Sequence, residues 1–475
     1  MYYESIMSST APNRVSWFSG TINPPKGSKV NGTNKYMGGP TLDNRDSVGC
    51  ERTDSGKPFS CVPLRWKTVP EYLQEAGISW RVYQDKDNFG DDPLVMWKQY
   101  QTSAKKKGDL AQRGTSFPGL QKFFDDARDG KLPEVAYIVA PMQLSEHPPY
   151  MPMDGAWLQG EVAKAVMHGK NWDSTALIYS YDETGGWADH VVSPYPPQSE
   201  ESEWIEDPYD KSNGITPIGP GFRLPFYIVS PWTSGGHVFT EHAAHESQIM
   251  FLEQWALAHG KPFTSEEIPT WRREQLSDLV KAFDFSSKDT SVPEVPHVRK
   301  PSQDIFTGHF NGADVCQAIH LKKVQPDIPY KKLNPSNSME VNKGFKRLRG
   351  DVTEGRRLTF EAHNRALSHN GSKLKSSSSG KEHDEKDQLF VVHWQGVNPK
   401  DNRFRIATTD QLYVTKSLSL SKNEEKAALF SLKDMGNGVG YSISELDSGK
   451  RLQLNEDGSV ALGGDTYFQI YSVTL

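Results

Sequence analysis

One stretch of the chain combines a buried-strand pattern with a dense group of polar residues. Residues 176–181 read Ala-Leu-Ile-Tyr-Ser-Tyr, an apolar run that is typical of a strand inside a sheet. Asp182 and Glu183 follow directly, and Gly185 and Gly186 come next. If the strand ends before the carboxylates and the chain curls through the glycines, both carboxylates can point at one cation. The alternative interpretation is an acidic turn after a buried strand, and the spacing alone favours neither.

Strand-like and helix-like segments alternate through the first half of the chain. This order predicts an α/β domain in which a mainly parallel sheet is flanked by helices. Open sheets of this kind keep their sites at the carboxyl ends of the strands, where the acidic stretch lies. The expected strands cover residues 78–83, 135–140, 176–181 and 222–229, and the expected helices cover residues 68–76, 118–128, 156–168 and 246–257.

The second half of the chain predicts a different architecture. We expect the first domain to span residues 1–290 and a connector to span residues 291–344. Residues 345–475 contain mostly strand-like segments, with a Ser/Lys-rich, linker-like insertion at 371–387. Similar segments recur there at a spacing of roughly 40 residues, which indicates a repetitive all-β module, either β-trefoil-like or a small β-sandwich. The similar segments are 358–374, 404–420 and 441–462.

Composition and charge exclude several classes of function. The net charge is −6 and the basic residues form no stripe, so we expect no nucleic-acid partner. No run of about 18 apolar residues predicts a transmembrane helix, and the first residues lack the pattern of a signal peptide. Cys50 and Cys61 flank a polar loop, which suits a local disulfide and weakly indicates an oxidising compartment, whereas Cys316 is left over.

Polar residues with catalytic potential follow the expected strands or begin the expected helices. Thr10 precedes Pro12 in the pattern of a helix N-terminus, where the hydroxyl either caps the helix or faces a phosphate. Loops at one edge of a sheet converge, and hydroxyl, carboxylate and imidazole groups together suit phosphoryl transfer with a cation. No Walker-type phosphate loop is present. Besides Thr10, the candidates are His147, Asp182, Glu183, Asp189, His190 and His245.

Five motifs occur in order between residues 10 and 236. They are Thr10-Ala-Pro-Asn-Arg14, Ser145-Glu-His-Pro148, Tyr181-Asp-Glu-Thr-Gly-Gly-Trp-Ala-Asp-His-Val191, Gly219-Pro-Gly-Phe-Arg-Leu-Pro225 and Ser230-Pro-Trp-Thr-Ser-Gly-Gly236. Together they resemble the phospholipase C/acid phosphatase family of phosphoesterases, in particular its fungal non-haemolytic phospholipase C-like members. That family belongs to the alkaline-phosphatase-like superfamily, so the resemblance implies that fold and a metal-dependent phosphoesterase.

The resemblance also implies roles for individual residues. Thr10 stands where the family places its nucleophile, and Asp182 and Glu183 stand where it places metal-ligating carboxylates, which the Thr10 oxygen joins. The divalent ion would be zinc, calcium or manganese, since oxygen and imidazole ligands admit all three. His147 is implied as a catalytic residue that contacts the phosphate. Asp189 and His190 are implied as further catalytic residues, and Asn13 and His245 as phosphate-binding residues.

The setting implied by the resemblance is extracellular, with a phospholipid or another phosphate ester as substrate and peripheral contact with a membrane surface.

The chain departs from the family pattern in two places. It contains no Glu-Asn-Arg-Ser-Phe-Asp-His motif, whose Glu and Asn complete the family's metal site, and Ala244 precedes His245 where Asp is common. We therefore expect a domain that lacks its N-terminal strand. The alternatives are an impaired homologue, a phosphomonoesterase, or a non-enzymatic carbohydrate- or membrane-binding protein acting through residues 345–475.

Overall fold

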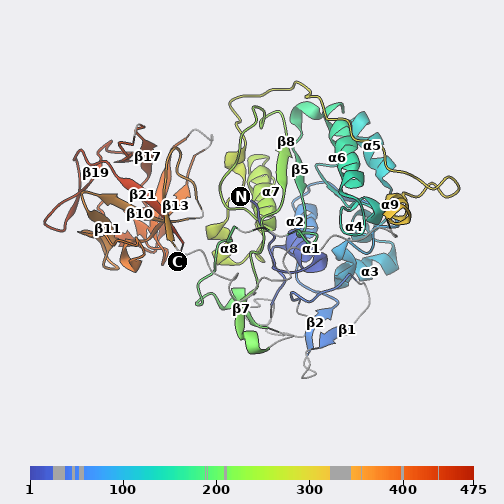
Figure 1. The fold of residues 1–475 in the computed structure, drawn as a ribbon, viewed down its shortest axis with the longest axis horizontal. Helices are drawn as coiled ribbons and strands as arrows, with labels where there is room; N and C mark the ends of the chain where they lie inside the picture. The colour runs from blue at the N-terminus through green and yellow to red at the C-terminus, as the bar shows by residue number, and fades with distance from the viewer. Residues whose placement is uncertain are drawn as a thin grey trace. The chain divides into compact units, whose positions relative to one another are not determined.

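The structure is a computed structural model that describes residues 1–24, 38–44, 49–52, 58–187, 189, 191–207, 211–320, 344–354, 356–396, 401–436 and 438–474. The chain divides into two compact units, one of mixed helices and strands and one built of strands (Figure 1). Among the described residues, no helix is both long and apolar enough to cross a bilayer. Unit 1 comprises Met1–Val238, Ala243–Arg273 and Ser287–Lys331, and unit 2 comprises Phe239–His242, Glu274–Ser286 and Lys332–Leu475.

Unit 1 contains short strands in pairs. β3 (Trp80–Tyr83) pairs in parallel with β4 (Val135–Ile138), and the central strand β5 (Leu177–Ser180) pairs antiparallel with β8 (Phe226–Val229). Of the strand pairs described in unit 1, β3–β4 is parallel and the others are antiparallel. The mainly parallel, alkaline-phosphatase-like sheet therefore stays a prediction. The remaining pairs are antiparallel, β1 (Gly49–Arg52) with β2 (Pro58–Val62) and β6 (Trp204–Glu206) with β7 (Ile215–Pro217).

Helices flank the β5–β8 pair, with α7 (His245–Ala258) on one side and α6 (Pro152–Met167) on the other (Figure 1). Pro152 occupies the first turn of α6, where its missing N–H costs nothing, so this helix begins four residues before the expected start. The apolar faces of α5 (Leu120–Asp129) and α6 pack together with Tyr83 of β3. The other helices are α1 (Thr10–Ser19), α2 (Val69–Glu75), α3 (Lys98–Lys106), α4 (Asp109–Gly114), α8 (Thr270–Gln275) and α9 (Gly312–His320).

The first residues of the chain are built into unit 1. The Tyr3 N–H donates to the carbonyl of Ala243 at 2.8 Å, and the Glu4 N–H donates to the carbonyl of Phe222 at 2.9 Å. The Tyr2 ring stacks on another ring at a centroid distance of 4.1 Å, and its side chain is 4 % exposed. This buried segment leads directly into α1 and therefore fixes where that helix begins.

Unit 2 is an antiparallel β unit, as the strand-rich sequence predicts. Its eleven-stranded sheet runs β12-β11-β10-β13-β14-β15-β16, with β17, β18, β21 and β9 attached off this path. Apolar side chains that alternate along these strands, among them Phe360, Phe390 and Phe430, form its core. The names β-trefoil and β-sandwich stay predictions. The strands are β9 (Gly344–Arg347), β10 (Arg357–Ala362), β11 (Arg365–His369), β12 (Leu374–Ser378), β13 (Phe390–Trp394), β14 (Phe404–Thr408), β15 (Tyr413–Val414), β16 (Leu420–Ser421), β17 (Phe430–Asp434), β18 (Tyr441–Glu445), β19 (Leu452–Leu454), β20 (Val460–Leu462) and β21 (Gln469–Thr474).

The linker-like insertion expected at 371–387 contains a strand instead. β12 pairs residue by residue with β11, and Leu374 and Ser376 are buried while Lys375 between them is exposed. This alternation is that of a half-buried strand. The interpretation as a linker was wrong for β12 because the pairing with β11, which composition does not reveal, orders this serine-rich run as a strand.

Part of the first expected domain also groups with the β unit. Residues 274–286 fall inside the expected range 1–290 but belong to unit 2. There the Lys281 ammonium lies 5.5 Å from the centroid of the Trp394 ring and 5.3 Å from that of Phe404. Trp394 and Phe404 lie far from Lys281 in the sequence, so local composition does not reveal this cation–π contact. In the expected connector, α9 is described and residues 321–343 lie outside the described residues.

The structure describes the side chain of one of the two cysteines in the expected local disulfide. Cys61 is disulfide-bonded, and Cys50 is its register partner across the β1–β2 pair. The Cys50 side chain lies outside the described residues. Cys316 is free.

Candidate active site

Thr10 is the first residue of α1, and Ser9 occupies the N-cap position. The capping interpretation of Thr10 is therefore wrong, and its half-buried hydroxyl lies in the first turn of the helix. N–H groups of a first helical turn lack partners within the helix and carry the positive end of its dipole. The Thr10 hydroxyl thus lies where an anion such as phosphate is favoured.

Asn13 holds the loop that leads into Thr10. Its side chain is fully buried, and its Oδ1 accepts the Ile6 N–H at 2.9 Å. Its Nδ2 donates to the carbonyls of Ile6 at 2.9 Å and of Ser8 and Ser9 at 3.2 Å. Because these bonds use the polar atoms of the amide, the geometry favours a positioning role for Asn13 over the predicted phosphate contact.

Arg14 is a site residue that the sequence patterns did not single out. It lies four residues after Thr10, so the two side chains share one face of α1. Its Nε donates to Asp182 Oδ2 at 2.7 Å, and its Nη1 donates to the carbonyl of Asp91 at 2.8 Å. Burial opposes ionisation of Asp182, but the Arg14 guanidinium outweighs it and lowers the pKa of that carboxyl. A partly buried cation is thereby fixed beside the Thr10 turn.

The two adjacent carboxylates lie in a turn after β5, as expected. Gly185 and Gly186 adopt φ values of +61° and +88°, which side chains disfavour, and the Gly185 N–H donates to Glu183 Oε2 at 2.7 Å. The His147 Nε2 lies 3.8 Å from Glu183 Oε1. Burial raises the pKa of Glu183, and the Asp182 charge adds to this effect. The structure thus brings His147, Asp182 and Glu183 to one place.

A third carboxyl, Glu4, lies within electrostatic range of this turn. Burial raises the pKa of Glu4 to about 8, and the charges of Glu183 and Asp182 contribute, while the Phe222 N–H acts in the opposite direction. Glu4 is therefore largely protonated near neutral pH. No sequence motif marks it, because only folding brings the first residues to the end of β5.

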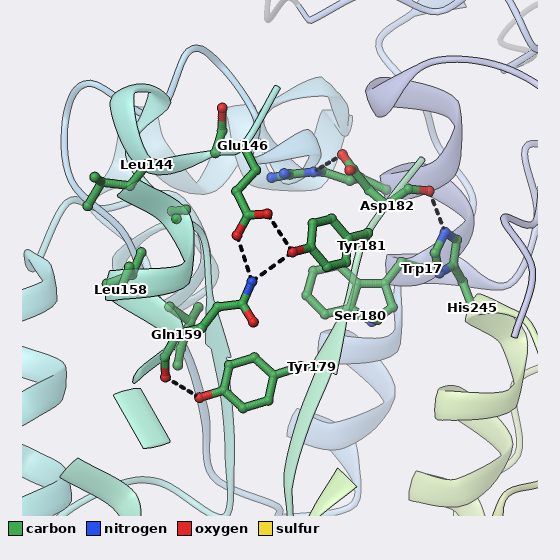
Figure 2. Close-up of a pocket in the computed structure, with 15 residues that line it drawn as sticks. Trp17, Leu144, Glu146, Leu158, Gln159, Tyr179, Ser180, Tyr181, Asp182 and His245 are labelled. Atoms are coloured by element: carbon green, nitrogen blue, oxygen red, sulfur yellow. Dashed lines mark hydrogen bonds and ion pairs between the residues drawn. The ribbon is translucent and has the colours of Figure 1, made fainter. Parts of the chain in front are cut away.

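The remaining predicted site residues are His245, Asp189 and His190, and the first two are held by contacts within the protein. His245 begins α7 fully buried, with Nδ1 bonded to the Tyr2 hydroxyl at 2.8 Å and Nε2 to the Asp182 carbonyl at 2.9 Å. Burial lowers its pKa, so the ring is neutral and supports the Asp182 turn (Figure 2). Asp189 accepts from both Nε and Nη2 of Arg223, at 2.5 and 3.0 Å. These contacts favour structural roles for His245 and Asp189. The predicted catalytic residue His190 lies outside the described residues.

The donor chemistry of Asp182 and Glu183 suits a divalent ion, but the arrangement around them does not complete a site. Within the described residues, no three His, Cys, Asp or Glu side chains are arranged to hold a metal ion. The Asp182 carboxylate, moreover, is already paired with Arg14. The described residues therefore do not fit the implied ion, and no catalytic step is assigned to it.

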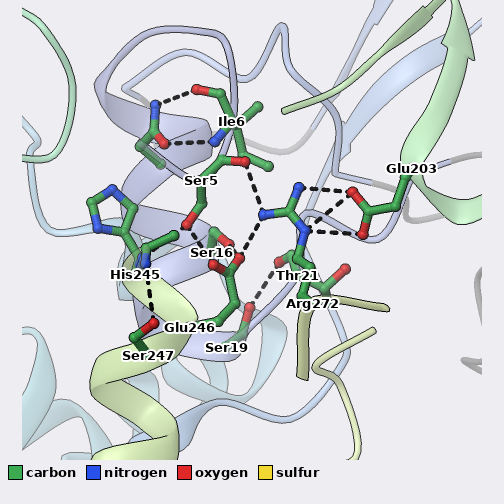
Figure 3. Close-up of polar contacts among 12 residues, drawn as sticks. Ser5, Ile6, Ser16, Ser19, Thr21, Glu203, His245, Glu246, Ser247 and Arg272 are labelled. Atoms are coloured by element: carbon green, nitrogen blue, oxygen red, sulfur yellow. Dashed lines mark hydrogen bonds and ion pairs between the residues drawn. The ribbon is translucent and has the colours of Figure 1, made fainter. Parts of the chain in front are cut away.

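A buried ion network fixes the elements that carry the site. Arg272 is 2 % exposed and pairs with Glu203 at 2.9 Å and with Glu246 at 2.8 Å (Figure 3). Glu246 also accepts the hydroxyls of Ser5 at 2.7 Å and Ser16 at 2.6 Å. These contacts tie the N-terminal segment, α1 and α7 together beneath the Thr10 turn.

Comparisons with known proteins agree with the sequence resemblance. The model of the Phosphoesterase family matches residues 1–257. A non-hemolytic phospholipase C of Burkholderia pseudomallei is 32% identical over 327 residues, which are 62% of this chain and 43% of the relative. A non-hemolytic phospholipase C of Pseudomonas aeruginosa is 34% identical over 358 residues, 72% of this chain and 46% of the relative. Phospholipase C B of Mycobacterium tuberculosis is 30% identical over 312 residues, which are 63% of this chain and 55% of the relative. The chain spans about half the length of these relatives.

Proposed function

Because the chain belongs to the phosphoesterase family, we propose that it hydrolyses the phosphoester bond of a phospholipid in the manner of a phospholipase C, with Thr10 as the nucleophile. One observation supports this most strongly. Thr10 begins α1 one turn before Arg14, whose guanidinium is held by Asp182 and Asp91. A hydroxyl beside a fixed, partly buried cation suits the transfer of a phosphoryl group.

In the proposed reaction the Thr10 oxygen attacks phosphorus, and the bond between phosphorus and the glycerol oxygen breaks. The Thr10 hydroxyl gives up its proton as the new bond forms, and the diglyceride oxygen takes up a proton and leaves as a neutral alcohol. Water then attacks the phosphothreonine, frees the phosphorylated headgroup and restores the hydroxyl. Arg14 and the positive N-terminal end of the α1 dipole stabilise the charge on the phosphate oxygens in both steps. We assign proton exchange with solvent to His147, whose side chain is 58 % exposed.

The test is hydrolysis of p-nitrophenyl phosphorylcholine and of phosphatidylcholine vesicles by the purified chain. We expect release of p-nitrophenol and of phosphocholine, with p-nitrophenyl phosphate turned over more slowly. A zinc, calcium or manganese ion stays part of the proposal and needs ligands beyond Asp182 and Glu183, so each assay is run with a chelator and with each ion. Absence of phosphodiester turnover in all of these conditions would refute the proposal, and faster monoester turnover would favour a phosphomonoesterase.

Replacement of Arg14 by methionine is expected to shift the pH dependence of hydrolysis. Arg14 lowers the pKa of Asp182, so its loss raises that pKa and lets Asp182 become protonated at higher pH. As the pH falls, the variant should therefore lose kcat/KM at a higher pH than the parent. The pH profile with the soluble substrate measures this shift, and an unchanged acid limb would show that Asp182 ionisation does not control the reaction.

Peripheral contact with a lipid surface is part of the proposal. Phe89 and Trp187 are 69 % and 66 % exposed. Phe89 lies just before Asp91 and Trp187 lies shortly after Asp182, and Arg14 donates hydrogen bonds to both of these aspartates. Exposed aromatic side chains of this kind insert into membrane interfaces. Replacing both by serine should lower vesicle hydrolysis, relative to soluble-substrate hydrolysis, by about tenfold. Leu257→Ser, a similarly exposed position in the last turn of α7, is the matched control and should leave the ratio unchanged.

An extracellular location belongs to the same proposal. The disulfide at Cys61 supports it, since disulfides persist in oxidising compartments.

A further inference from the structure

The turn between two strands of unit 2 carries a short sequence with a chemical meaning of its own. β11 ends at His369 and β12 begins at Leu374, and the turn between them opens with Asn370-Gly371-Ser372. Asparagine followed two residues later by serine or threonine, with no proline between, is the sequence that accepts N-linked oligosaccharides. Because the same sequence also occurs where no sugar fits, the geometry of the turn decides whether Asn370 is available.

The Asn370 turn is open to solvent. Asn370, Gly371 and Ser372 are all exposed. Gly371 has a φ of +80°, which suits glycine, and a Cβ built on it would meet no atom within 4 Å. The buried core begins only at Leu374, after the turn. A bulky, hydrated oligosaccharide on Asn370 would therefore extend into solvent and displace no packed side chain.

The side chains of Asn370 and Ser372 contact each other within the turn. Asn370 Oδ1 accepts the Ser372 hydroxyl at 2.9 Å and the N–H groups of Ser372 and Lys373 at 3.2 and 3.1 Å. Among the described residues, no group accepts a hydrogen bond from Asn370 Nδ2. The oxygen of this amide is thus held by three donors, while the nitrogen that would carry the sugar is left unengaged.

These contacts bear on the chemistry of the transfer. The lone pair of an amide nitrogen is delocalised into the carbonyl, so the nitrogen is a poor nucleophile unless it also loses a proton. Donors on Asn370 Oδ1 withdraw electron density and make an Nδ2 proton easier to lose. In the transfer, Nδ2 forms a bond to the anomeric carbon of a lipid-linked oligosaccharide diphosphate. The bond from that carbon to the diphosphate oxygen breaks, the lipid diphosphate leaves, and a base of the transferase takes the proton.

The frame of the turn does not depend on a sugar. The Asn370 N–H donates to the carbonyl of Lys373 at 3.3 Å, and the Leu420 N–H donates to the carbonyl of Ser372 at 2.8 Å. These backbone bonds fix both ends of the turn and remain when the Ser372 side chain is changed. Variants at position 372 should therefore fold like the parent.

A second exposed asparagine of the same unit provides an internal comparison. Asn364 lies in the turn between β10 and β11 and is exposed, with a φ of +59°. Arg365 and Ala366 follow it, so no hydroxyl stands at the second position. Exposure alone would make the two asparagines equivalent, whereas N-linked transfer requires the hydroxyl and selects Asn370.

We propose that Asn370 is an N-glycosylation site that receives its oligosaccharide on Nδ2 from a transferase of the secretory pathway. The inference rests on the extracellular location proposed above and is independent of the hydrolytic reaction. The disulfide at Cys61 supports passage through the same oxidising compartment. An oligosaccharide there would make the β11–β12 end of unit 2 a hydrated surface.

The test is peptide mass spectrometry of the full chain, secreted from yeast behind a secretion leader and also purified from its natural source. Trypsin cuts after Arg365 and Lys373 and places Asn364 and Asn370 on separate peptides. We expect an oligosaccharide on the Asn370 peptide and none on the Asn364 peptide. Removal by a peptide N-glycosidase in heavy-oxygen water should leave a labelled aspartate at 370, and incubation without the glycosidase corrects for spontaneous deamidation of the Asn-Gly sequence.

Variants of the hydroxyl residue separate recognition of the sequence from mere exposure. Ser372→Ala keeps Asn370 but should abolish the modification, and Ser372→Thr should retain it. Ser417→Ala, which removes an exposed serine outside any such sequence, is the matched control and should leave the modification unchanged. Thermal unfolding checks that each variant folds.

The outcomes distinguish this site from the proposed function. A secreted, folded chain without an oligosaccharide at Asn370 would overturn the proposal, and so would a Ser372→Ala protein that keeps it. Modification confined to Asn31-Gly-Thr33, a second such sequence that lies outside the described residues, would also overturn it, as would a natural protein that is unmodified at Asn370. Turnover of p-nitrophenyl phosphorylcholine is measured on the same samples. If Asn370 is modified but nothing is hydrolysed, the proposed function fails and the glycosylation site stands.

Discussion

Replacing Thr10 by alanine is expected to lower kcat by at least roughly 10⁴-fold while leaving the fold intact, because removal of a covalent nucleophile leaves only binding and electrostatic stabilisation. Alanine is a good helix former, and Thr10 is not the N-cap of α1, so the variant should keep the helix. Turnover of p-nitrophenyl phosphorylcholine measures the loss. Acid-quenched parent protein should also carry the mass of a phosphorylated headgroup on Thr10, and the variant should not.

Two neighbouring substitutions control this experiment. Ser9→Ala removes a hydroxyl one residue earlier, at an N-cap that makes no side-chain capping bond, so activity should stay near the parent value. Thr10→Ser retains a hydroxyl at the nucleophile position and should recover part of the lost turnover. If Thr10→Ala keeps a tenth or more of the parent kcat, another group is the nucleophile and the proposed mechanism is wrong.

The elements of unit 1 were predictable because their signals are local. The apolar run at 176–181 contains β5, and the capping box of Thr68 and Glu71 begins α2 where the sequence indicated a helix. The run at 222–229 gave a shorter strand, since Pro225 has no N–H to pair and β8 begins after it. The pairing of β5 with β8 was not predictable, because it joins segments almost fifty residues apart and no local pattern specifies the partner.

The residues of the candidate site likewise divide into those that local motifs predicted and those whose roles depend on long-range contacts. Thr10, Asp182, Glu183 and His147 were found because the motifs themselves contain them. Arg14 also stood in a motif, but its role depends on an ion pair to Asp182 across 168 positions of sequence. The contacts of Glu146 were missed for a similar reason, since they reach Tyr181 after β5 and Gln159 of α6. Contacts that form only on folding decide which residue of a motif binds a ligand and which one, such as Asn13, supports the backbone.

Replacement of Arg272 by methionine is expected to destabilise unit 1 by about 3–5 kcal/mol, since it leaves buried carboxylates without their cation. Glu203 and Glu246 are both fully buried, and each forms an ion pair with Arg272. Methionine fills much of the arginine volume, so the loss reports the charge rather than a cavity. Thermal unfolding at neutral pH should show a Tm lower by roughly 10 °C. The same change in exposed Arg128, whose side chain is 64 % exposed, is the control and should leave Tm unchanged.

The pH dependence of this loss distinguishes the ion network from simple packing. Burial opposes ionisation of Glu246, but Arg272 outweighs it and lowers the pKa of Glu246, so in the parent this stability is lost as the pH falls through the lowered pKa. In the variant, burial acts without the cation and raises the pKa of Glu246 above its ordinary value. The variant therefore gains stability as the pH falls and Glu246 takes up a proton. The Tm difference between parent and variant should narrow on acidification, and a difference that stays constant across pH would assign the role of Arg272 to packing. Because Ser5 and Ser16 also bond to Glu246, the variant should displace α1 and lower kcat even at temperatures where it remains folded.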